Sequence, residues 1–590
     1  MRVTRVHRSR AALLIGSLTL LAATTSAAGG TVNSPDGGAQ RSAASAARTR
    51  SAPTIPSARV GAFYFDGWSG TLGNFHWGGL LGTQFSNRRP VSGWTDDRPE
   101  AVEAQLRWAH ADGIGFFAFD WYYNPDPGNG PINMAHDTYL KLRDHDGVGF
   151  ALNYVNQPGF VIPPDQWATV AEKWATQDFL NPDYVRIDGK PLLVILDEHG
   201  FNVQMGGAAG VNAAIATLQE AAKRHGLPGV FVVGGRYLWW TNEQCFPQCL
   251  DTDGDFPLEH YDAITEFSYP YILEPRDGPR PYSEVAAAIE RMWEVIAQRS
   301  PFPHIPSVMA GFDPRPMILA GQIQPPDQGG WPLLNGHETW FDTTPADVGG
   351  LVSDAVTWVR AHPSMRVEPA PTPPVVLIQS WNELQEGAIL VPTEKDGYAY
   401  GQAIAQAVGI AWTAPPKHTL SVAPSSGGRV ASTPSGIACP TACSAGFDEG
   451  LEISLTATPK PGFVLDGWTG CTPDGTSCSL VLVADSKARP VLTRVVQRRA
   501  VSLRLAARLV ARGRISVLDG YSGCGAYEAI QIQRRRRSSW ATIGSTQTNQ
   551  AGAYSLKVRN RPGTYRARAP RSSSGEHTCL TASSPPIASR

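Results

Sequence analysis

Several motifs are missing from this sequence of 590 residues. No GxGxxG or GxxxxGK[ST] segment follows an early candidate strand, so nucleotide binding has no support. No HExxH segment and no Ser-His-Asp order can be recognised, which removes the usual indications of a zinc peptidase or a serine hydrolase. Beyond the first 28 residues, the sequence has no apolar run of the ~20 residues that a membrane-spanning helix needs.

Acidic residues are scarce in the last part of the chain. From Arg498 to Arg590 there are 17 Lys or Arg residues and 3 acidic residues, a net charge of +14. The whole chain has 51 basic and 52 acidic residues and a net charge of -1, which leaves -15 for the residues before Arg498. Such an asymmetry argues against a single uniform surface for nucleic acid.

The composition is that of a loop-rich globular protein. Hydrophobic residues make up 42% and charged residues 17%, with 59 Gly and 48 Pro. These values exclude a mainly disordered chain and a coiled coil. At roughly 150 residues per domain, the length allows about four structural units, or one large barrel with smaller companions.

The N-terminal segment has the pattern of a secretory signal. Arginines at 2, 5, 8 and 10 precede an apolar run over 11–23, and small residues follow at 26–28. We therefore predict a signal peptide over 1–28 and a secreted or cell-surface protein, with a retained membrane anchor as the alternative. Residues 29–58 are Ser, Ala, Gly and Pro without an apolar period, which predicts a disordered linker.

The eight cysteines are even in number, which favours disulfides in an exported chain. Local pairing is the simplest arrangement, although eight cysteines permit about 105 connectivities. The CxxxC spacings do not fit a structural zinc site. The predicted pairs are Cys245 with Cys249, Cys439 with Cys443, Cys471 with Cys478, and Cys524 with Cys579.

Short apolar runs alternate with segments of helical period, which is typical of repeated βα units. Eight such runs predict a (β/α)8 TIM barrel of the α/β class over 59–415, with an open doubly wound sheet as the alternative. The predicted strands are 60–68, 113–123, 147–156, 191–197, 230–236, 263–269, 305–313 and 374–383, and the clearest helices are 99–112, 208–225, 283–299 and 344–362.

After residue 415 the pattern changes to short alternating stretches with Gly, Pro and Ser turns, which predicts two small all-β domains. Residues 416–496 contain four cysteines and the segment Gly467-Trp468-Thr469-Gly470-Cys471, and they resemble the bacterial repeat modules related to internalin B-repeats. Residues 497–590 resemble a small, basic β-sandwich accessory domain. The run Arg534 to Arg537 is expected to be a solvated hairpin, with binding to an anionic polymer or nucleic acid as the alternative.

Catalytic groups of such barrels lie at the carboxyl ends of the strands, and here these ends are rich in acids and aromatics. Aromatic faces stack on sugar rings, and carboxylates and amides bind hydroxyls, so a carbohydrate site is predicted. As alternatives, Asp120 and Asp313 would cap helices and Glu266 would form a salt bridge. The predicted substrate-binding residues are Tyr64, Asp66, Trp68, Asp120, Trp121, Tyr122, Asn153, Asn156, Glu266, Tyr269, Asp313, Trp381 and Asn382.

Glu383 and Glu386 are the best candidates for catalysis. They follow the eighth predicted strand and are three residues apart. Two carboxylates near one scissile bond are enough for glycoside hydrolysis, and their mutual repulsion would raise one pKa towards the range of an acid catalyst. The alternative is that Glu386 caps a helix and Glu383 pairs with an arginine.

The segment Trp381-Asn-Glu-Leu-Gln-Glu-Gly387 resembles the WNE-x-x-EG motif of glycoside hydrolase family 99 and its WbsX-like relatives. The resemblance implies a retaining glycosidase of α-mannosides, in which Glu383 assists the sugar 2-hydroxyl through an anhydrosugar and Glu386 is the general acid/base. Supporting matches such as Gly311-Phe-Asp-Pro-Arg-Pro316 extend over about 60–408. Leu390-Val391-Pro392 replaces an Ile-Glu-Pro of the family, which leaves the preference for mannose open.

The sequence therefore predicts a secreted retaining glycoside hydrolase that acts on a polysaccharide or glycan. The two C-terminal modules are expected to bind a cell-wall or surface polymer. No cofactor, metal or nucleotide is predicted, and no stable membrane span after signal cleavage. Two alternatives remain open, a non-catalytic carbohydrate-binding or adhesion protein and a polysaccharide-processing transferase.

Overall fold

The computed structural model describes residues 56–69, 80–125, 131–237, 259–267, 273, 276–319, 338–423, 425–506, 510–559 and 561–589. The predicted signal peptide and nearly all of the predicted linker lie outside these residues. Tyr269, Cys245 and Cys249 also lie outside them.

Eight parallel strands form one sheet in the order β7-β6-β5-β3-β2-β1-β11-β9. The two edges of this sheet meet, because the Ile264 N–H donates to the Pro303 carbonyl at 3.0 Å and the Ile305 N–H donates to the Ile264 carbonyl at 2.9 Å. The predicted TIM barrel is confirmed and the open sheet is excluded. The strands are β1 (Arg59–Tyr64), β2 (Ile114–Trp121), β3 (Gly149–Tyr154), β5 (Lys190–Ile195), β6 (Phe231–Tyr237), β7 (Ala263–Phe267), β9 (Ser307–Met309) and β11 (Val375–Gln379).

The barrel strands are apolar because both of their faces are covered. Every residue of β11, with the sequence VVLIQ, is buried. The rings of Phe63 and Phe267 lie 5.2 Å apart although β1 and β7 are not neighbours in the sheet, so this contact crosses the barrel interior. Side chains therefore fill the barrel, as in other barrels of eight strands.

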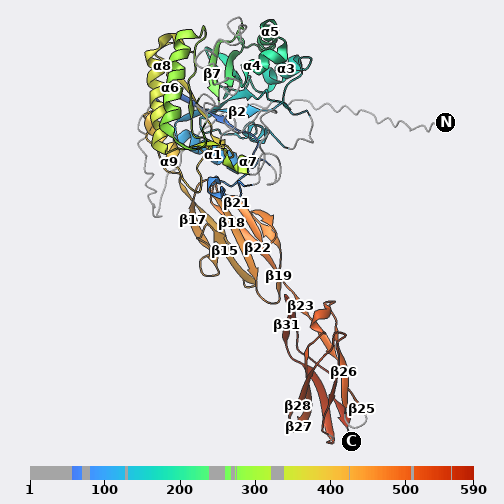
Figure 1. The fold of residues 1–590 in the computed structure, drawn as a ribbon. Helices are drawn as coiled ribbons and strands as arrows, with labels where there is room; N and C mark the ends of the chain where they lie inside the picture. The colour runs from blue at the N-terminus through green and yellow to red at the C-terminus, as the bar shows by residue number, and fades with distance from the viewer. Residues whose placement is uncertain are drawn as a thin grey trace, which may run out of the picture. The chain divides into compact units, whose positions relative to one another are not determined.

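Helices cover the outside of the barrel, and α6 and α8 lie side by side there (Figure 1). Thr344 caps α8 through a capping box with Asp347, and Pro345 follows as its first residue. None of the described helices is both long and apolar enough to cross a membrane. The helices are α1 (Pro99–Ala111), α2 (Met134–Tyr139), α3 (Trp167–Gln177), α4 (Glu198–Met205), α5 (Ala208–Arg224), α6 (Tyr282–Arg299), α7 (Arg315–Leu319), α8 (Pro345–Ala361) and α9 (Ala399–Ala407).

Three short strand pairings are additional to those between the eight parallel strands of the barrel. The eighth predicted strand ends earlier than expected, at Gln379, and the chain then turns into the β12–β13 hairpin that carries the candidate glutamates. The additional pairs are β8 (Gly278–Pro281) with β10 (Thr339–Asp342), β12 (Asn382–Glu383) with β13 (Ala388–Ile389), and β4 (Arg186–Ile187) with β5.

The first β module has two sheets, β17-β14-β22-β19 and β16-β15-β18-β21-β20. Alternating apolar residues of β18, such as Ile453 and Leu455, are buried in the core between the two sheets. The Cys439–Cys443 and Cys471–Cys478 disulfides are present as predicted. The strands are β14 (Lys417–Val422), β15 (Gly428–Thr433), β16 (Ala438–Cys439), β17 (Ser444–Asp448), β18 (Glu452–Pro459), β19 (Phe463–Thr469), β20 (Thr472–Asp474), β21 (Ser477–Val481) and β22 (Ser486–Arg494).

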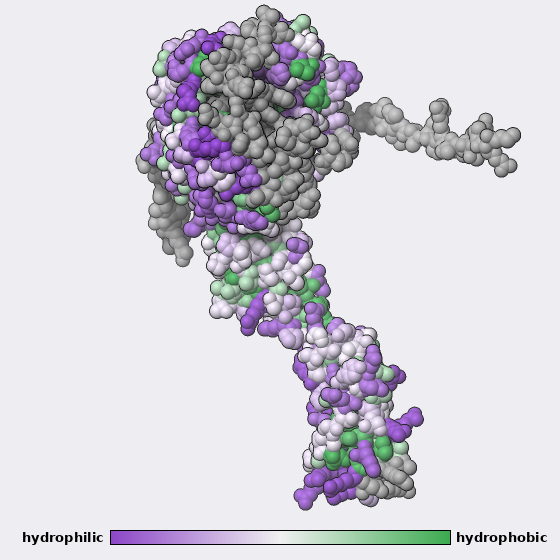
Figure 2. Space-filling model, viewed as in Figure 1, coloured by the Kyte–Doolittle hydropathy of each residue, from purple (hydrophilic) through white to green (hydrophobic). Residues whose placement is uncertain are grey.

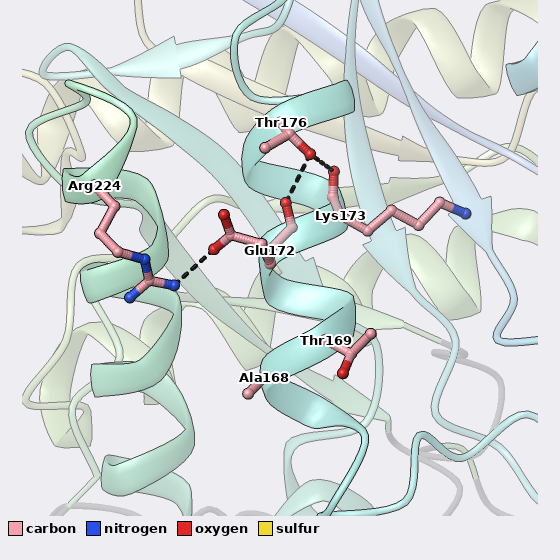
Figure 3. Close-up of a pocket in the computed structure, with 6 residues that line it drawn as sticks. All are labelled: Ala168, Thr169, Glu172, Lys173, Thr176 and Arg224. Atoms are coloured by element: carbon pink, nitrogen blue, oxygen red, sulfur yellow. Dashed lines mark hydrogen bonds and ion pairs between the residues drawn. The ribbon is translucent and has the colours of Figure 1, made fainter. Parts of the chain in front are cut away.

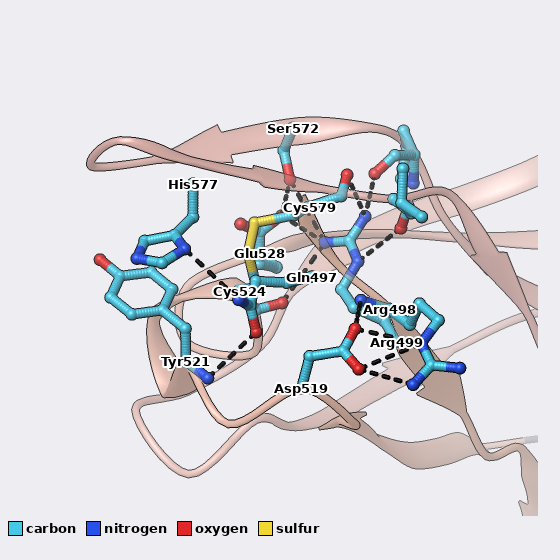
Figure 4. The surroundings of a disulfide bond; sticks show 12 residues. Gln497, Arg498, Arg499, Asp519, Tyr521, Cys524, Glu528, Ser572, His577 and Cys579 are labelled. Carbon is cyan, nitrogen blue, oxygen red and sulfur yellow. Dashed lines mark hydrogen bonds and ion pairs between the residues drawn. A yellow bond between two sulfur atoms is a disulfide. The ribbon is translucent and has the colours of Figure 1, made fainter. Parts of the chain in front are cut away.

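The second β module packs one sheet containing β24, β26, β25 and β29 against another containing β28, β27, β30, β33 and β34. The predicted Cys524–Cys579 disulfide is present, and beside it the buried Arg499 guanidinium pairs with Glu528 at 3.0 Å (Figure 4). The strands are β23 (Val496–Gln497), β24 (Arg499–Val501), β25 (Arg504–Ala506), β26 (Val510–Val517), β27 (Ala529–Arg536), β28 (Ser539–Gln547), β29 (Ala553–Lys557), β30 (Gly563–Ala569), β31 (Ser572–Ser574), β32 (His577–Cys579), β33 (Ala582–Ser583) and β34 (Ile587–Ser589).

Candidate active site

The β12–β13 hairpin presents Glu383 and Glu386 at the carboxyl end of the barrel. Its first strand is held by Ser380, whose hydroxyl accepts from the Glu383 N–H at 3.0 Å and donates to the Ala388 carbonyl at 2.9 Å. The Trp381 N–H donates to the Phe63 carbonyl of β1 at 2.7 Å, which fixes the start of the hairpin to the barrel. Both glutamates therefore stand on a short, hydrogen-bonded loop.

Gly387 closes this hairpin in a conformation that favours glycine. Its φ is +74°, in the left-handed region. A Cβ at this position would lie 2.8 Å from the Asp313 nitrogen, and the Asp313 N–H donates to the carbonyl of the preceding Glu386. The glycine of the sequence motif is therefore needed because the backbone after β9 packs directly against the hairpin.

Arg88 supports the hairpin from the loop that follows β1. One of its guanidinium nitrogens, Nη1, donates to the Leu384 carbonyl at 3.0 Å, the Gln385 carbonyl at 3.3 Å and the Asp313 carbonyl at 2.9 Å. The other, Nη2, pairs with the Asp313 carboxylate. Although burial acts to raise the pKa of Asp313, hydrogen bonds from Arg315 and the charge of Arg88 hold it below its usual value. Asp313, predicted to bind substrate, is thus an ionised anchor of the hairpin.

Three carboxyl groups lie close together at this end of the barrel. Glu383 is 8% exposed and Asp120 is 4% exposed, whereas Glu386 is half-buried. Burial raises the pKa of Glu383 well above its usual value, and the charges of Glu386 and Asp120 raise it further. Burial also raises the pKa of Glu386 to about 7 and that of Asp120 to about 8. The cluster can therefore hold and exchange protons near neutral pH.

Two further acids line the same region. The Asp66 carboxylate accepts from the Ala135 N–H at 2.9 Å and the His136 N–H at 2.8 Å, and burial raises its pKa to about 6. The Tyr64 hydroxyl donates to Asp96 at 3.0 Å, and burial raises the pKa of Asp96 well above its usual value. Asp96 was not predicted from the sequence, because it follows no strand and belongs to no periodic segment.

The predicted amide residues mainly position other groups. Asn382 accepts from the Phe65 N–H at 2.8 Å and donates to the Phe65 carbonyl at 3.0 Å, and the Trp68 indole donates to the Asn382 carbonyl at 2.7 Å. Asn153 donates to Asp120 at 2.7 Å. Asn156 donates to the Asp197 carbonyl at 2.7 Å and accepts from the Asp197 N–H at 3.0 Å.

Tyr122 is the predicted aromatic residue whose electrostatics connect it most directly with the cluster. It is buried, and its pKa is raised well above the usual value by burial and then by the charges of Asp120, Glu383, Asp66 and Glu386. Its ring packs edge-on against Phe160 at 4.8 Å. Tyr122 therefore stays neutral and keeps its hydroxyl proton available as a donor.

Four predicted substrate-binding residues instead face the helix layer. Tyr64 is fully buried and packs against Phe117 and Phe119 at 5.1 and 4.9 Å, on the side of β1 opposite Phe63. The Trp381 indole is fully buried and donates to Gln105 of α1 at 2.8 Å. Trp121 packs edge-on against Trp174 of α3 at 5.0 Å. Glu266 is fully buried, and its Oε1 lies 2.6 Å from Nε2 of His304. For Tyr64, Trp121 and Glu266 the physical reason is strand alternation, which turns every second side chain away from the barrel interior. Trp381 lies between β11 and β12, outside both strands.

Among the described residues, no group of three or more His, Cys, Asp or Glu side chains is arranged to hold a metal ion. A hollow on the outer surface of α3 and α5 is lined by Ala168, Thr169, Glu172, Lys173, Thr176 and Arg224 (Figure 3). Its main polar contact is the 2.6 Å ion pair between Glu172 and Arg224. This hollow lies in the helix layer and contains none of the clustered acids, so it is a surface feature distinct from the candidate site.

Comparison with known proteins gives one family match and several similar solved structures. Residues 418–487 match the family described as a divergent InlB B-repeat domain, which confirms the resemblance of the first β module. Among solved structures, a glycoside hydrolase-like protein is 17% identical with a TM-score of 0.40, covering 60% of this chain and 95% of that one.

Two other solved structures are similar over the same length. The GH99 endo-α-mannosidase from Bacteroides thetaiotaomicron is 15% identical with a TM-score of 0.39, covering 60% of this chain and 99% of that one. A family 1 β-glucosidase from Thermotoga maritima is 10% identical with a TM-score of 0.33, covering 61% of this chain and 99% of that one. No curated protein sequence matches the chain.

Proposed function

We propose that this chain is a retaining glycoside hydrolase with Glu383 and Glu386 as its catalytic residues. The observation that carries the proposal is the position of both glutamates on one short hairpin at the carboxyl end of the barrel, in surroundings that raise both pKa values. Glycosidases need one carboxyl that is protonated and one that is ionised near the same bond. The two glutamates interact and can share one proton. Burial and the charges of Glu386 and Asp120 favour protonation of Glu383 in the free protein, so the roles assigned below require the shared proton to lie on Glu386 when the glycan is bound.

Exposure supports a division of roles between the two glutamates. Glu386 is half-buried, so it can exchange its proton with solvent and later activate a water molecule. Glu383 is 8% exposed and suits contact with a bound sugar rather than with bulk water. We therefore assign Glu386 as the general acid/base and Glu383 as the base for the sugar 2-hydroxyl.

The proposed reaction has two steps. Glu386 gives a proton to the leaving oxygen while Glu383 takes the proton of the 2-hydroxyl, whose oxygen attacks C1 and forms a 1,2-anhydrosugar. Water then attacks C1, its proton passes to Glu386, and Glu383 returns a proton to the 2-oxygen. Two inversions at C1 give net retention. The Arg88 contacts would keep the hairpin in place through both steps.

The proposed substrate is a polysaccharide or glycan. Tyr122 and Asp120 are the described residues best placed to bind its hydroxyls. After burial, the charges of nearby acids raise their pKa values, and these acids include Glu383 and Glu386 for Tyr122 and Glu386 for Asp120. An α-mannoside is the first candidate, on the strength of the WNE-x-x-EG motif. We further propose export through a signal peptide over 1–28, a catalytic domain over 59–415, a repeat module over 416–496 and a β-sandwich over 497–590.

A glycan-release assay tests this proposal. The purified chain would be incubated with α-mannan and a panel of bacterial and fungal polysaccharides, and new reducing ends and their anomeric configuration would be followed by NMR. Release of the α-anomer from an α-linked polymer supports the retaining hydrolase. Binding without release supports the non-catalytic alternative, and elongated products without net release support the transferase.

A further inference from the structure

The last β module has a sheet in which three neighbouring strands carry no acidic residue. They are β28, β27 and β30, with the sequences SWATIGSTQ, AIQIQRRR and GTYRARA. β27 ends in three arginines and β30 contributes Arg566 and Arg568. In Figure 2, strongly hydrophilic residues gather near the ends of β27 and β28.

The outward side of this sheet carries arginine and glutamine side chains and Trp540, whereas Ile530 and Ile532 on its inward side are fully buried. Cross-strand pairs place Gln531 beside Arg568, Gln533 beside Arg566, and Arg535 beside Trp540. We call these six outward residues the arginine face.

Contacts between side chains hold the arginine face in a fixed arrangement. Arg566 donates to Gln533 at 2.8 Å and lies 4.3 Å from the centre of the Trp540 ring, and Arg568 donates to Gln531 at 3.2 Å. Because the glutamines are neutral, these contacts order the guanidinium groups without cancelling their charge.

The acids of this module do not neutralise the arginine face. Asp519 pairs with Arg498 at 2.7 Å and Glu528 pairs with Arg499 at 3.0 Å (Figure 4). The third acid, Glu576, lies in the turn between β31 and β32. No ion pair within the described part of the chain involves Arg566 or Arg568. Burial and then the charge of Arg568 lower the pKa of Arg566, as expected for cations crowded without a counter-charge.

We propose that the arginine face binds an acidic polysaccharide that carries carboxylate or phosphodiester groups. Guanidinium groups bind both kinds of oxygen through paired hydrogen bonds, and the neighbouring amides can bind sugar hydroxyls. A single-stranded nucleic acid fits less well, because its binding surfaces use aromatic rings free to stack on bases. Here the face has one tryptophan, and Arg566 lies against it. This inference does not depend on the activity of the barrel.

The test measures binding of the full chain to four immobilised probes at about 50 mM salt, where electrostatic contacts are weakly screened. Polygalacturonate supplies carboxylates, poly(glycerol phosphate) supplies phosphodiesters, dextran is the neutral control, and single-stranded DNA is the competing polyanion. The test variant is Arg566→Gln/Arg568→Gln. The matched control is Arg504→Gln/Arg512→Gln, which removes the same charge from an exposed cross-strand pair on the other sheet.

We expect binding to at least one acidic polysaccharide and none to dextran. The Arg566→Gln/Arg568→Gln variant should bind about tenfold more weakly, and the control should change by less than about twofold. If the test variant does not fold, Arg535→Gln, at an exposed position of the arginine face, replaces it. Equal losses in both double variants, no binding to either acidic polysaccharide, or tighter binding to DNA would each overturn the proposal.

Discussion

Arg88 and Asp313, which are 225 positions apart in the sequence, form an ion pair that braces the hairpin carrying both candidate glutamates. The same guanidinium donates to two carbonyls of that hairpin, and the Asp313 N–H donates to a third. The geometry of Glu383 and Glu386 therefore depends on two loops from distant parts of the barrel.

Replacing Arg88 with lysine should lower kcat by about tenfold or more while KM changes by less than about threefold. Lysine keeps the positive charge beside Asp313, but its single ammonium nitrogen cannot replace the planar guanidinium that donates to several carbonyls at once. Steady-state kinetics on the released glycan would measure both constants. Arg89→Lys is the matched control, because Arg89 pairs with Glu394 and Glu452 and not with the hairpin. An unchanged kcat, or a change in KM alone, would argue against a positioning role.

The activity should decline as pH rises above about 7. Glu386 must be protonated to act as an acid, and burial raises its pKa to about 7. Because Glu383 and Glu386 interact, the apparent pKa values of the kcat/KM profile belong to the pair. The profile would be recorded from about pH 4 to about pH 9, with enzyme returned to the optimum pH to exclude denaturation. A plateau that persists to about pH 9 would contradict the assigned acid.

A buried acid far from the site should make stability depend on pH. Asp112 at the end of α1 accepts from the Trp412 indole at 3.0 Å, and burial raises its pKa from 3.8 to about 7. Between these values the folded state holds a proton that the unfolded chain releases, so stability falls as pH rises from about 4 to about 7.

Asp112→Asn should weaken this pH dependence, because asparagine has no proton to lose. We expect the fall in unfolding free energy between about pH 5 and about pH 8 to shrink by on the order of 2 kcal/mol. Urea unfolding at the two pH values would measure the change. The exposed Asp165→Asn serves as the control. An Asp112→Asn variant with the wild-type pH dependence would show that Asp112 is ionised in the folded protein at pH values where we expect it to be neutral.

The disulfides should differ in their contribution to stability. Cys524–Cys579 joins residues 55 positions apart, whereas Cys439–Cys443 joins residues 4 apart. Loop-closure entropy predicts losses of about 4 and about 2 kcal/mol on removal. Calorimetric unfolding of Cys524→Ser/Cys579→Ser and Cys439→Ser/Cys443→Ser would compare them. Equal losses would mean that chain entropy does not set the difference.

The barrel and the WNE-x-x-EG segment over 381–387 could both be predicted from the sequence. Strands covered on both faces must be apolar, so runs such as 375–379 are easily recognised. Glu383 and Glu386 lie close in the sequence, and one hairpin holds both. Three disulfide pairs were also predicted, because each lies within its own module.

Contacts between distant loops and the direction of side chains at strand ends could not be predicted from the sequence. Arg88 and Asp96 lie in a segment without a helical or strand period, so no local pattern points to them. Trp121 is the last residue of β2 and Trp381 lies shortly after β11, and both look like sugar-stacking residues, yet they pack against helices. Their direction depends on where the strand ends, which local sequence fixes poorly.

The most direct test of the catalytic assignment compares Glu383→Gln, Glu386→Gln and Glu394→Gln with the wild type on the best substrate of the panel. Glu394→Gln is the matched control, because it makes the same substitution at an exposed glutamate eight positions after Glu386. We predict that both hairpin variants lose about a thousandfold or more in the rate of reducing-end release while still binding the glycan, and that Glu394→Gln stays within about twofold. Wild-type release by either hairpin variant would contradict the account.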